Sequence, residues 1–175
     1  MRIIAGDRRG SKIAAPKGDT TRPTSDRVRE AAYNLIGPVD EAAVLDLFAG
    51  SGAMGLEALS RGARRCVFVE SDRAAVRVIH DNLEKLRFTG ALVLQKDAFQ
   101  ALREERGRTH DLIIVDPPYG TWPDLEPRLA EALPPLLAPN GLLVVETSAR
   151  VEPKLPLELV TSRRYGSARI TLFTQ

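Results

Sequence analysis

The sequence has few of the residues from which disulfide frameworks and metal sites are built. Its 175 residues include one cysteine, Cys66, and two histidines, His80 and His110, which stand apart without ligand-like spacing around them. A single cysteine excludes an intramolecular disulfide and a cysteine-based zinc site. We therefore expect a protein that uses no metal.

Long apolar runs are also absent. No run approaches the roughly 20 residues that a membrane-spanning helix requires, and the amino terminus lacks the apolar segment of a signal peptide. We expect a soluble, cytoplasmic protein without a membrane partner. At 175 residues and 43% hydrophobic content, the chain suits one compact domain whose sheet is covered on both faces.

The charge is distributed unevenly, although the formal net charge is only +2. Residues 1–29 contain eight Lys or Arg and three Asp, whereas the remainder contains seventeen basic and twenty acidic residues. A basic segment on a near-neutral body favours a polyanionic partner, although such charges can also be ordinary solvated surface. Within residues 1–37 we expect a small hairpin from strands at 2–6 and 11–14, then an amphipathic helix that ends at Gly37-Pro38.

The stretch 44–62 has the pattern of a strand, a glycine-rich turn and a helix. Its apolar start, Val44-Leu45-Asp46-Leu47, is typical of a buried parallel strand. Gly50, Gly52 and Gly55 follow, and the helical pattern then continues to Gly62. This geometry brings backbone N–H groups and a helix N-terminus close to a ligand, and a Cβ in the turn would block the ligand or forbid a positive φ.

Two cofactors are compatible with this turn. The spacing Gly50-x-Gly52-x-x-Gly55, with Glu70 twenty residues after Gly50, matches a dinucleotide-binding fingerprint, so a dehydrogenase is an alternative. Asp46 argues against a dinucleotide, because a carboxylate just before the turn would repel a pyrophosphate. The same carboxylate would favour the sulfonium and ammonium groups of S-adenosyl-L-methionine, directly or through water.

From residue 44 onwards, strand and helix patterns alternate. This alternation predicts an α/β fold with an open parallel sheet and right-handed crossovers. The later strands are expected at 66–70, 91–95, 111–115 and 141–146, and the helices at 73–87, 98–103 and 124–137, the last interrupted by prolines. At the carboxyl end, residues 157–164 and 168–173 flank Tyr165-Gly166-Ser167 and predict a β-hairpin.

Acidic residues lie at the ends of four of the predicted strands: Asp46, Glu70, Asp97 and Asp116. Ligands of open α/β sheets bind beyond the carboxyl ends of the strands. Glu70 is placed to accept both ribose hydroxyls of a cofactor, while Asp97 and the N–H of Ala98 could contact an adenine ring. Each acid taken singly could instead cap a helix, Asp97 in particular.

The tetrapeptide Asp116-Pro117-Pro118-Tyr119 is the most informative motif. Its prolines stiffen the backbone and remove two N–H donors. The Asp116 carboxylate and an adjacent free carbonyl would form a two-acceptor clamp for an exocyclic amine, and Tyr119 offers a flat face for stacking a base. Such a clamp would orient the nitrogen lone pair toward a sulfonium methyl. No strong base is needed before attack, because the proton leaves readily once the nitrogen is cationic.

Together these motifs resemble the class I S-adenosyl-L-methionine-dependent methyltransferases and, more narrowly, the bacterial 16S rRNA (guanine-N2)-methyltransferases. The resemblance runs nearly end to end, through Arg2-Ile3-Ile4-Ala5-Gly6, Arg9-Gly10, Thr21-Arg22-Pro23-Thr24-x-Asp26-Arg27-Val28-Arg29-Glu30, Leu45-Asp46-Leu47-Phe48-Ala49-Gly50-Ser51-Gly52 and Asp116-Pro117-Pro118-Tyr119. It departs at Ala32-Tyr33, where a larger apolar residue and Phe are expected, which concerns local packing only. The resemblance implies a Rossmann-like, mostly parallel seven-stranded sheet with an antiparallel last strand.

The resemblance also implies an activity and its partners. One guanine amine of 16S rRNA would be methylated, within a partly assembled small ribosomal subunit, leaving S-adenosyl-L-homocysteine as the product. We expect the protein to act as a monomer. Other readings remain open: an amino-methyltransferase of DNA adenine or a protein amide, a dehydrogenase, and a non-catalytic RNA-binding module.

Carried over to this sequence, the resemblance implies two segments and three groups of site residues. Residues 1–37 would form a basic RNA-binding extension, and residues 38–175 the methyltransferase domain. The cofactor pocket would be lined by Asp46, Phe48, Ala49, Gly50, Ser51, Gly52, Glu70, Ser71, Asp97 and Ala98. The target base would meet Asp116, Pro117, Pro118 and Tyr119. RNA would be contacted by Arg2, Arg9, Arg22, Thr24, Arg27 and Arg29.

Overall fold

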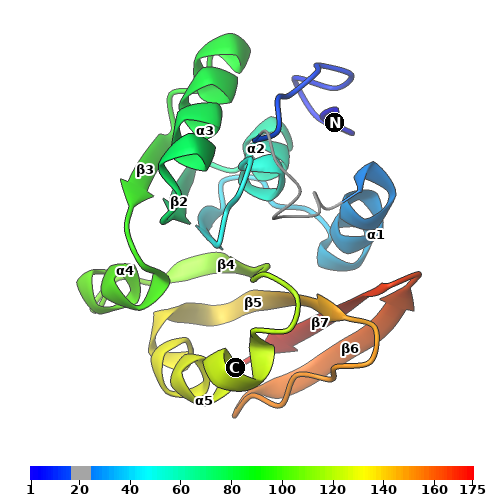
Figure 1. Cartoon of the computed structure of the whole chain (residues 1–175), viewed down its shortest axis with the longest axis vertical. Coiled ribbons are helices and arrows are strands. Elements are labelled where there is room, and N and C mark those ends of the chain that lie inside the picture. Colours follow the sequence, from blue (N-terminus) through cyan, green and yellow to red (C-terminus); the bar gives the residue numbers. More distant parts are fainter. Residues whose placement is uncertain (17–24) are drawn as a thin grey trace.

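The computed structural model describes residues 1–16 and 25–175. A seven-stranded sheet with the strand order β3-β2-β1-β4-β5-β7-β6 runs through the molecule (Figure 1). Its strands are β1 (Ala43–Leu47), β2 (Arg65–Glu70), β3 (Ala91–Gln95), β4 (His110–Val115), β5 (Leu137–Ser148), β6 (Glu158–Tyr165) and β7 (Ala168–Thr174).

The chain adds β2 and β3 on one side of β1 and then β4 and β5 on the other side, so the strand order reverses between β1 and β4. Neighbouring strands among β1 to β5 pair in parallel, and β7 runs antiparallel to both β5 and β6. This arrangement confirms the predicted fold class, the seven-stranded sheet of class I methyltransferases with a reversed last strand. The expected carboxyl-terminal hairpin is β6 and β7.

Helices cover both faces of the sheet because each buried strand is apolar on both sides. On one face lie α1 (Asp26–Ile36), α2 (Ala53–Ser60) and α3 (Arg73–Leu86), and on the other lie α4 (Ala98–Glu104) and α5 (Trp122–Ala132) (Figure 1). Successive residues of β1 divide between the two cores: Val44 belongs to the core that contains Ile79 of α3, whereas Leu45 belongs to the core that contains Phe99 of α4. The sheet therefore separates two hydrophobic cores.

Two elements differ from the sequence expectation. The helix expected at 124–137 ends at Ala132, and a short 3-10 turn, η1 (Pro134–Leu136), follows, because Pro134 and Pro135 have no N–H with which to continue the helix. Strand β5 begins at Leu137, four residues before its expected start. Near the amino terminus, the expected hairpin is reduced to one antiparallel bridge between Arg2 and Lys12.

Helix α1 starts where the sequence predicts. Ser25 is its N-cap, and the Ser25 hydroxyl accepts a hydrogen bond of 3.2 Å from the N–H of Val28. Gly37 ends the helix with a positive φ of 82° and donates its N–H to Tyr33. Residues 17–24, which include the predicted RNA contacts Arg22 and Thr24, lie outside the described residues.

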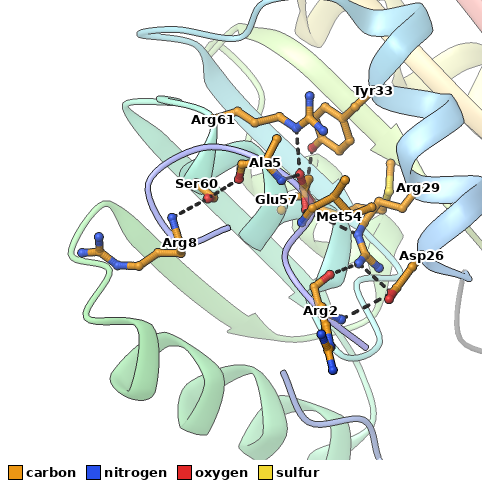
Figure 2. A network of polar contacts seen from close by, with 12 residues as sticks. Arg2, Ala5, Arg8, Asp26, Arg29, Tyr33, Met54, Glu57, Ser60 and Arg61 are labelled. Carbon is orange, nitrogen blue, oxygen red and sulfur yellow. Dashed lines mark hydrogen bonds and ion pairs between the residues drawn. The ribbon is translucent and has the colours of Figure 1, made fainter. Parts of the chain in front are cut away.

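The amino-terminal segment is anchored to the core through one buried acid, Glu57 of α2 (Figure 2). Its carboxylate accepts the N–H groups of Ile4 and Ala5 at 2.8 and 3.0 Å. The same carboxylate pairs with Arg61 at 2.8 Å and with Arg29 at 3.6 Å. The segment 1–16 thus packs against the domain, with Ile3 and Ile13 buried in the core that α1, α2 and α3 cover.

Within the described residues 1–16 and 25–175, no helix is long and apolar enough to cross a membrane. The same residues contain no group of three or more His, Cys, Asp or Glu side chains placed to hold a metal ion.

Candidate active site

The glycine turn between β1 and α2 is open where a ligand would lie and closed where it meets the sheet. Gly50 has a φ of +55°, and a Cβ built on it would have no heavy atom within 4 Å. At Gly55 a Cβ would lie 2.4 Å from the Phe68 ring and 2.6 Å from the sulfur of Cys66. Gly55 is therefore required for close packing of α2 on β2, whereas Gly50 keeps the open side of the turn clear.

Glu70, the last residue of β2, lies directly beside this turn. Its Oε2 accepts the N–H of Gly50 at 2.8 Å, and its Oε1 accepts the N–H of Asp72 at the same distance. The turn is also tied to β2 by a 3.0 Å hydrogen bond from the N–H of Ala49 to the carbonyl of Val69. Glu70 and Gly50, both predicted to line the cofactor pocket, are thus in direct contact.

Asp46 lies beneath the turn. The residue is 1% exposed, and its Oδ2 accepts the N–H of Gly55 at 2.9 Å, which joins β1 to the first turn of α2. Burial raises the pKa of Asp46 to about 8; the Gly55 hydrogen bond opposes this, and the charges of Asp116 and Glu70 add to it. Through this hydrogen bond Asp46 positions the turn, and its contact with a cofactor, directly or through water, stays a prediction.

The Asp116–Tyr119 segment follows β4, and it emerges next to the turn because β1 and β4 are neighbours. Val115 pairs with Leu47, and the N–H of Asp116 approaches the carbonyl of Leu47 at 3.4 Å. The side chain of Asp116 is close enough for its charge to raise the pKa of Asp46. The predicted target-base residues and the predicted cofactor residues therefore meet at one edge of the sheet.

Tyr119 is held in place by a residue that the sequence analysis did not assign. Its hydroxyl donates to Oε1 of Glu146 on β5 at 3.2 Å, while 44% of the Tyr119 surface stays exposed. A signal for Glu146 was present in the sequence, because Glu146 ends the predicted strand 141–146 just as the other acids end theirs. The next turn is closed by Thr121, whose hydroxyl donates to the Pro118 carbonyl at 2.6 Å.

Asp97 caps a helix, which is the simpler of its two predicted roles. Its Oδ1 accepts the N–H groups of Phe99 and Gln100 at 3.0 and 3.3 Å, at the start of α4. Asp97 remains exposed at the end of β3, beside the end of β2, and Ala98 is buried behind it. Ser71 is exposed next to Glu70, and Phe48 is half-buried against the α4 and α5 core.

The predicted RNA-contacting arginines divide into two groups. Arg2, Arg9 and Arg27 are exposed, as a contact with RNA requires. Arg29 is not: its side chain is fully buried, bonded to Asp26 at 2.9 Å and to the carbonyl of Arg2 (Figure 2). The prediction for Arg29 was wrong, because this guanidinium neutralises the buried Glu57 carboxylate inside the domain.

A pocket of about 520 Å³ opens beside Tyr119. The start of α1 contributes its N-cap Ser25 and Arg27, β5 contributes Glu146, and the end of β6 contributes Tyr165, which the residues of the β6–β7 turn follow. The pocket connects the Asp116–Tyr119 segment with α1 and the carboxyl-terminal hairpin, three parts of the chain that are far apart in the sequence.

Comparison with known proteins identifies the family. A family model described as "Conserved hypothetical protein 95" matches residues 1–174. The chain belongs to this family. The match covers the basic segment, the glycine turn and the carboxyl-terminal hairpin together.

Two proteins of similar sequence and one solved structure show how closely this chain resembles known proteins. "Ribosomal RNA small subunit methyltransferase D" of Escherichia coli is 40% identical over 92% of this chain and 78% of its own length. The Haemophilus influenzae protein of the same name is 36% identical over 84% of this chain and 78% of its own length. The structure of Thermus thermophilus protein TTHA0928 superposes with a TM-score of 0.86 and 32% identity, covering 100% of this chain and 99% of that one. The relatives' names confirm the resemblance to small-subunit rRNA methyltransferases.

Proposed function

We propose that this protein transfers a methyl group from S-adenosyl-L-methionine to the exocyclic N2 amine of one guanine in 16S rRNA. The names of the relatives support a methyltransferase that acts on small-subunit rRNA. A cytoplasmic monomer that acts on a partly assembled subunit is the form we propose for it. We assign the guanine amine as the methyl acceptor because the Asp116 carboxylate can accept hydrogen bonds from an exocyclic amine.

One observation carries the proposal: the Asp116–Tyr119 segment lies beside the glycine turn, because β4 and β1 are paired neighbours. The turn fits the cofactor, since Gly50 leaves open space where a Cβ would project and the Glu70 carboxylate borders that space. Glu70 would hold the ribose hydroxyls. When bound, S-adenosyl-L-methionine supplies a methyl group activated by a positively charged sulfur.

The residues of this chain would then bind and orient the acceptor. The Asp116 carboxylate and a neighbouring proline-locked carbonyl would accept the two N–H bonds of the exocyclic amine, which directs the nitrogen lone pair away from them. Tyr119, with its hydroxyl held by Glu146, would stack on the flipped base. Holding the amine in this way supplies orientation, and the proton is lost after attack without a strong base.

Asp116→Ala tests the proposal. We expect methyl transfer to fall by at least about 100-fold because the amine is no longer oriented, while the affinity for S-adenosyl-L-homocysteine changes less than about threefold. Asp124→Ala, which removes an exposed acid at the start of α5, is the matched control and should transfer normally. Transfer of a labelled methyl group to small-subunit RNA would be measured, with DNA and protein fractions as parallel acceptors.

The atom that carries the transferred methyl group decides whether the acceptor is the N2 amine of guanine. Nuclease digestion and mass spectrometry of the labelled RNA should give one N2-methylguanosine. Label in adenine, in DNA or in a protein amide would refute the guanine assignment, and undiminished transfer by Asp116→Ala would refute the clamp. Binding of a nicotinamide cofactor in place of S-adenosyl-L-homocysteine would support the dehydrogenase alternative.

A further inference from the structure

The pocket beside Tyr119 is separate from the space at the glycine turn. Its lining includes Tyr119 but neither Asp116 nor any residue of the turn between Gly50 and Gly55. The pocket therefore takes neither the cofactor nor the amine that Asp116 would hold. Since Tyr119 belongs to both sites, a group bound in the pocket would lie next to the base held by Asp116.

The chemistry of the pocket suits a nucleotide. Its volume of about 520 Å³ is in the range of small-ligand sites. Two aromatic rings, Tyr119 and Tyr165, line it, and aromatic faces bind unpaired bases by stacking. A base in this position needs no pairing partner, which suits a strand from which the neighbouring guanine has been flipped.

Tyr165 faces the pocket because of the register of the sheet. It pairs with Ala168, which pairs with Ser148, so Tyr165 lies on the same face of the sheet as Glu146, two residues before Ser148. Tyr165 also packs against the core beneath α1 and is only partly exposed. The ring is therefore held by packing before any ligand binds, which lowers the entropic cost of stacking.

Arg27 supplies positive charge at the rim of the pocket, whose lining also includes Arg164 and the acid Glu146. Arg27 is exposed on the first turn of α1, and within residues 1–16 and 25–175 its guanidinium forms no salt bridge. The amino end of α1 adds its partial positive charge on the same side. A phosphate at this rim would be bound by Arg27, while the attached base enters between the tyrosines.

We infer that this pocket binds the RNA nucleotide adjacent to the methylated guanine, with Tyr165 stacking on its base and Arg27 binding its phosphate. The inference rests on the proposed function for the identity of its neighbour, but its binding readout is independent of methyl transfer. Tyr165 thereby becomes an RNA-binding residue at the far end of the chain from the basic segment.

Variants of Tyr165 test the inference through RNA affinity. Tyr165→Leu keeps apolar packing but removes the ring, and it should weaken binding of a fluorescent single-stranded 16S rRNA fragment by about 5- to 50-fold. Tyr165→Phe is the matched control and should bind within about twofold of the wild type. The affinity for S-adenosyl-L-homocysteine and the unfolding temperature of the variants would show that the fold is intact.

An abasic scan of the same RNA locates the contact. For the wild type and Tyr165→Phe, one abasic position adjacent to the methylated guanine should cost about 5- to 50-fold in affinity, and for Tyr165→Leu less than about twofold. Arg27→Gln should lower the slope of log affinity against log salt by about 0.7, as loss of one single-strand phosphate contact requires. Arg77→Gln, an exposed arginine on α3, should leave the slope unchanged.

The outcomes separate the two proposals. If the wild type methylates RNA but Tyr165→Leu binds as tightly as Tyr165→Phe, the pocket inference is overturned and the proposed function stands. If Tyr165→Leu loses affinity while the wild type transfers no methyl group to RNA, the pocket is a nucleotide site and the proposed function fails.

Discussion

Asp46 couples the stability of the protein to pH. Burial raises the pKa of its carboxyl group to about 8, so between about pH 4 and pH 8 the folded chain keeps a proton that the unfolded chain has lost. The stability contributed by Asp46 is therefore fully present below pH 4 and is lost as the pH rises to 8. Asp46→Asn keeps an acceptor for the N–H of Gly55 but cannot titrate.

We predict that stability of the wild type falls relative to that of Asp46→Asn by about 2–5 kcal/mol between pH 4 and pH 8. Urea unfolding at intervals across this range measures the difference. Parallel pH profiles for the two proteins would mean that Asp46 is ionised in the folded state at neutral pH, and that another residue neutralises it.

At the scale of the element, the strand–turn–helix unit β1–α2 contains glycines with different roles. Gly55→Ala should destabilise the fold by about 1–3 kcal/mol, because its Cβ would overlap Phe68 and Cys66. Gly50→Ala places its methyl in open space and should cost only about 1 kcal/mol of backbone strain. The same methyl projects where the cofactor would lie, so we predict about tenfold weaker binding of S-adenosyl-L-homocysteine for Gly50→Ala alone.

Thermal unfolding and titration calorimetry, run on both variants, separate stability from binding. Gly55→Ala serves as the control for binding, provided it is measured well below its unfolding temperature. Equal cofactor affinities for the two variants would show that the cofactor does not approach Gly50.

At the scale of the whole molecule, Arg29 and Glu57 join the amino-terminal segment, α1 and α2 into one body (Figure 2). Arg29 and Arg27, two residues apart on one helix, therefore have different effects when replaced by Gln. Arg29→Gln leaves a buried carboxylate with one partner fewer and should cost about 2–4 kcal/mol of stability. Arg27→Gln should change stability by less than about 0.5 kcal/mol but should weaken RNA binding in a salt-dependent way.

Chemical denaturation and RNA-binding titrations at several salt concentrations would test this pair. The interpretation is contradicted if Arg29→Gln is as stable as the wild type, or if Arg27→Gln binds RNA with an unchanged salt slope. In the second case the exposed arginine is ordinary solvated surface.

Much of the fold could be predicted because its signals are local. The period of apolar residues located the parallel strands, glycine marked the end of α1, and Gly166 marked the hairpin turn between β6 and β7. The boundaries were less accurate where several prolines follow one another, as at the end of α5. There the missing N–H groups end the helix, while the continuing apolar residues belong to the next strand.

The sequence by itself determined the parts of the site that depend on neighbouring residues: the glycine turn, the acids at the strand ends and the proline-locked Asp116 segment. Only the tertiary structure decided which charges are used internally. Arg27 and Arg29 are the same residue type in the same helix, but Arg29 faces the core and Arg27 faces solvent. The hydrogen bond between Tyr119 and Glu146 likewise depends on the strand order, and so does the position of Tyr165 in the same pocket as Tyr119. A sheet brings together the ends of strands that are far apart in the chain.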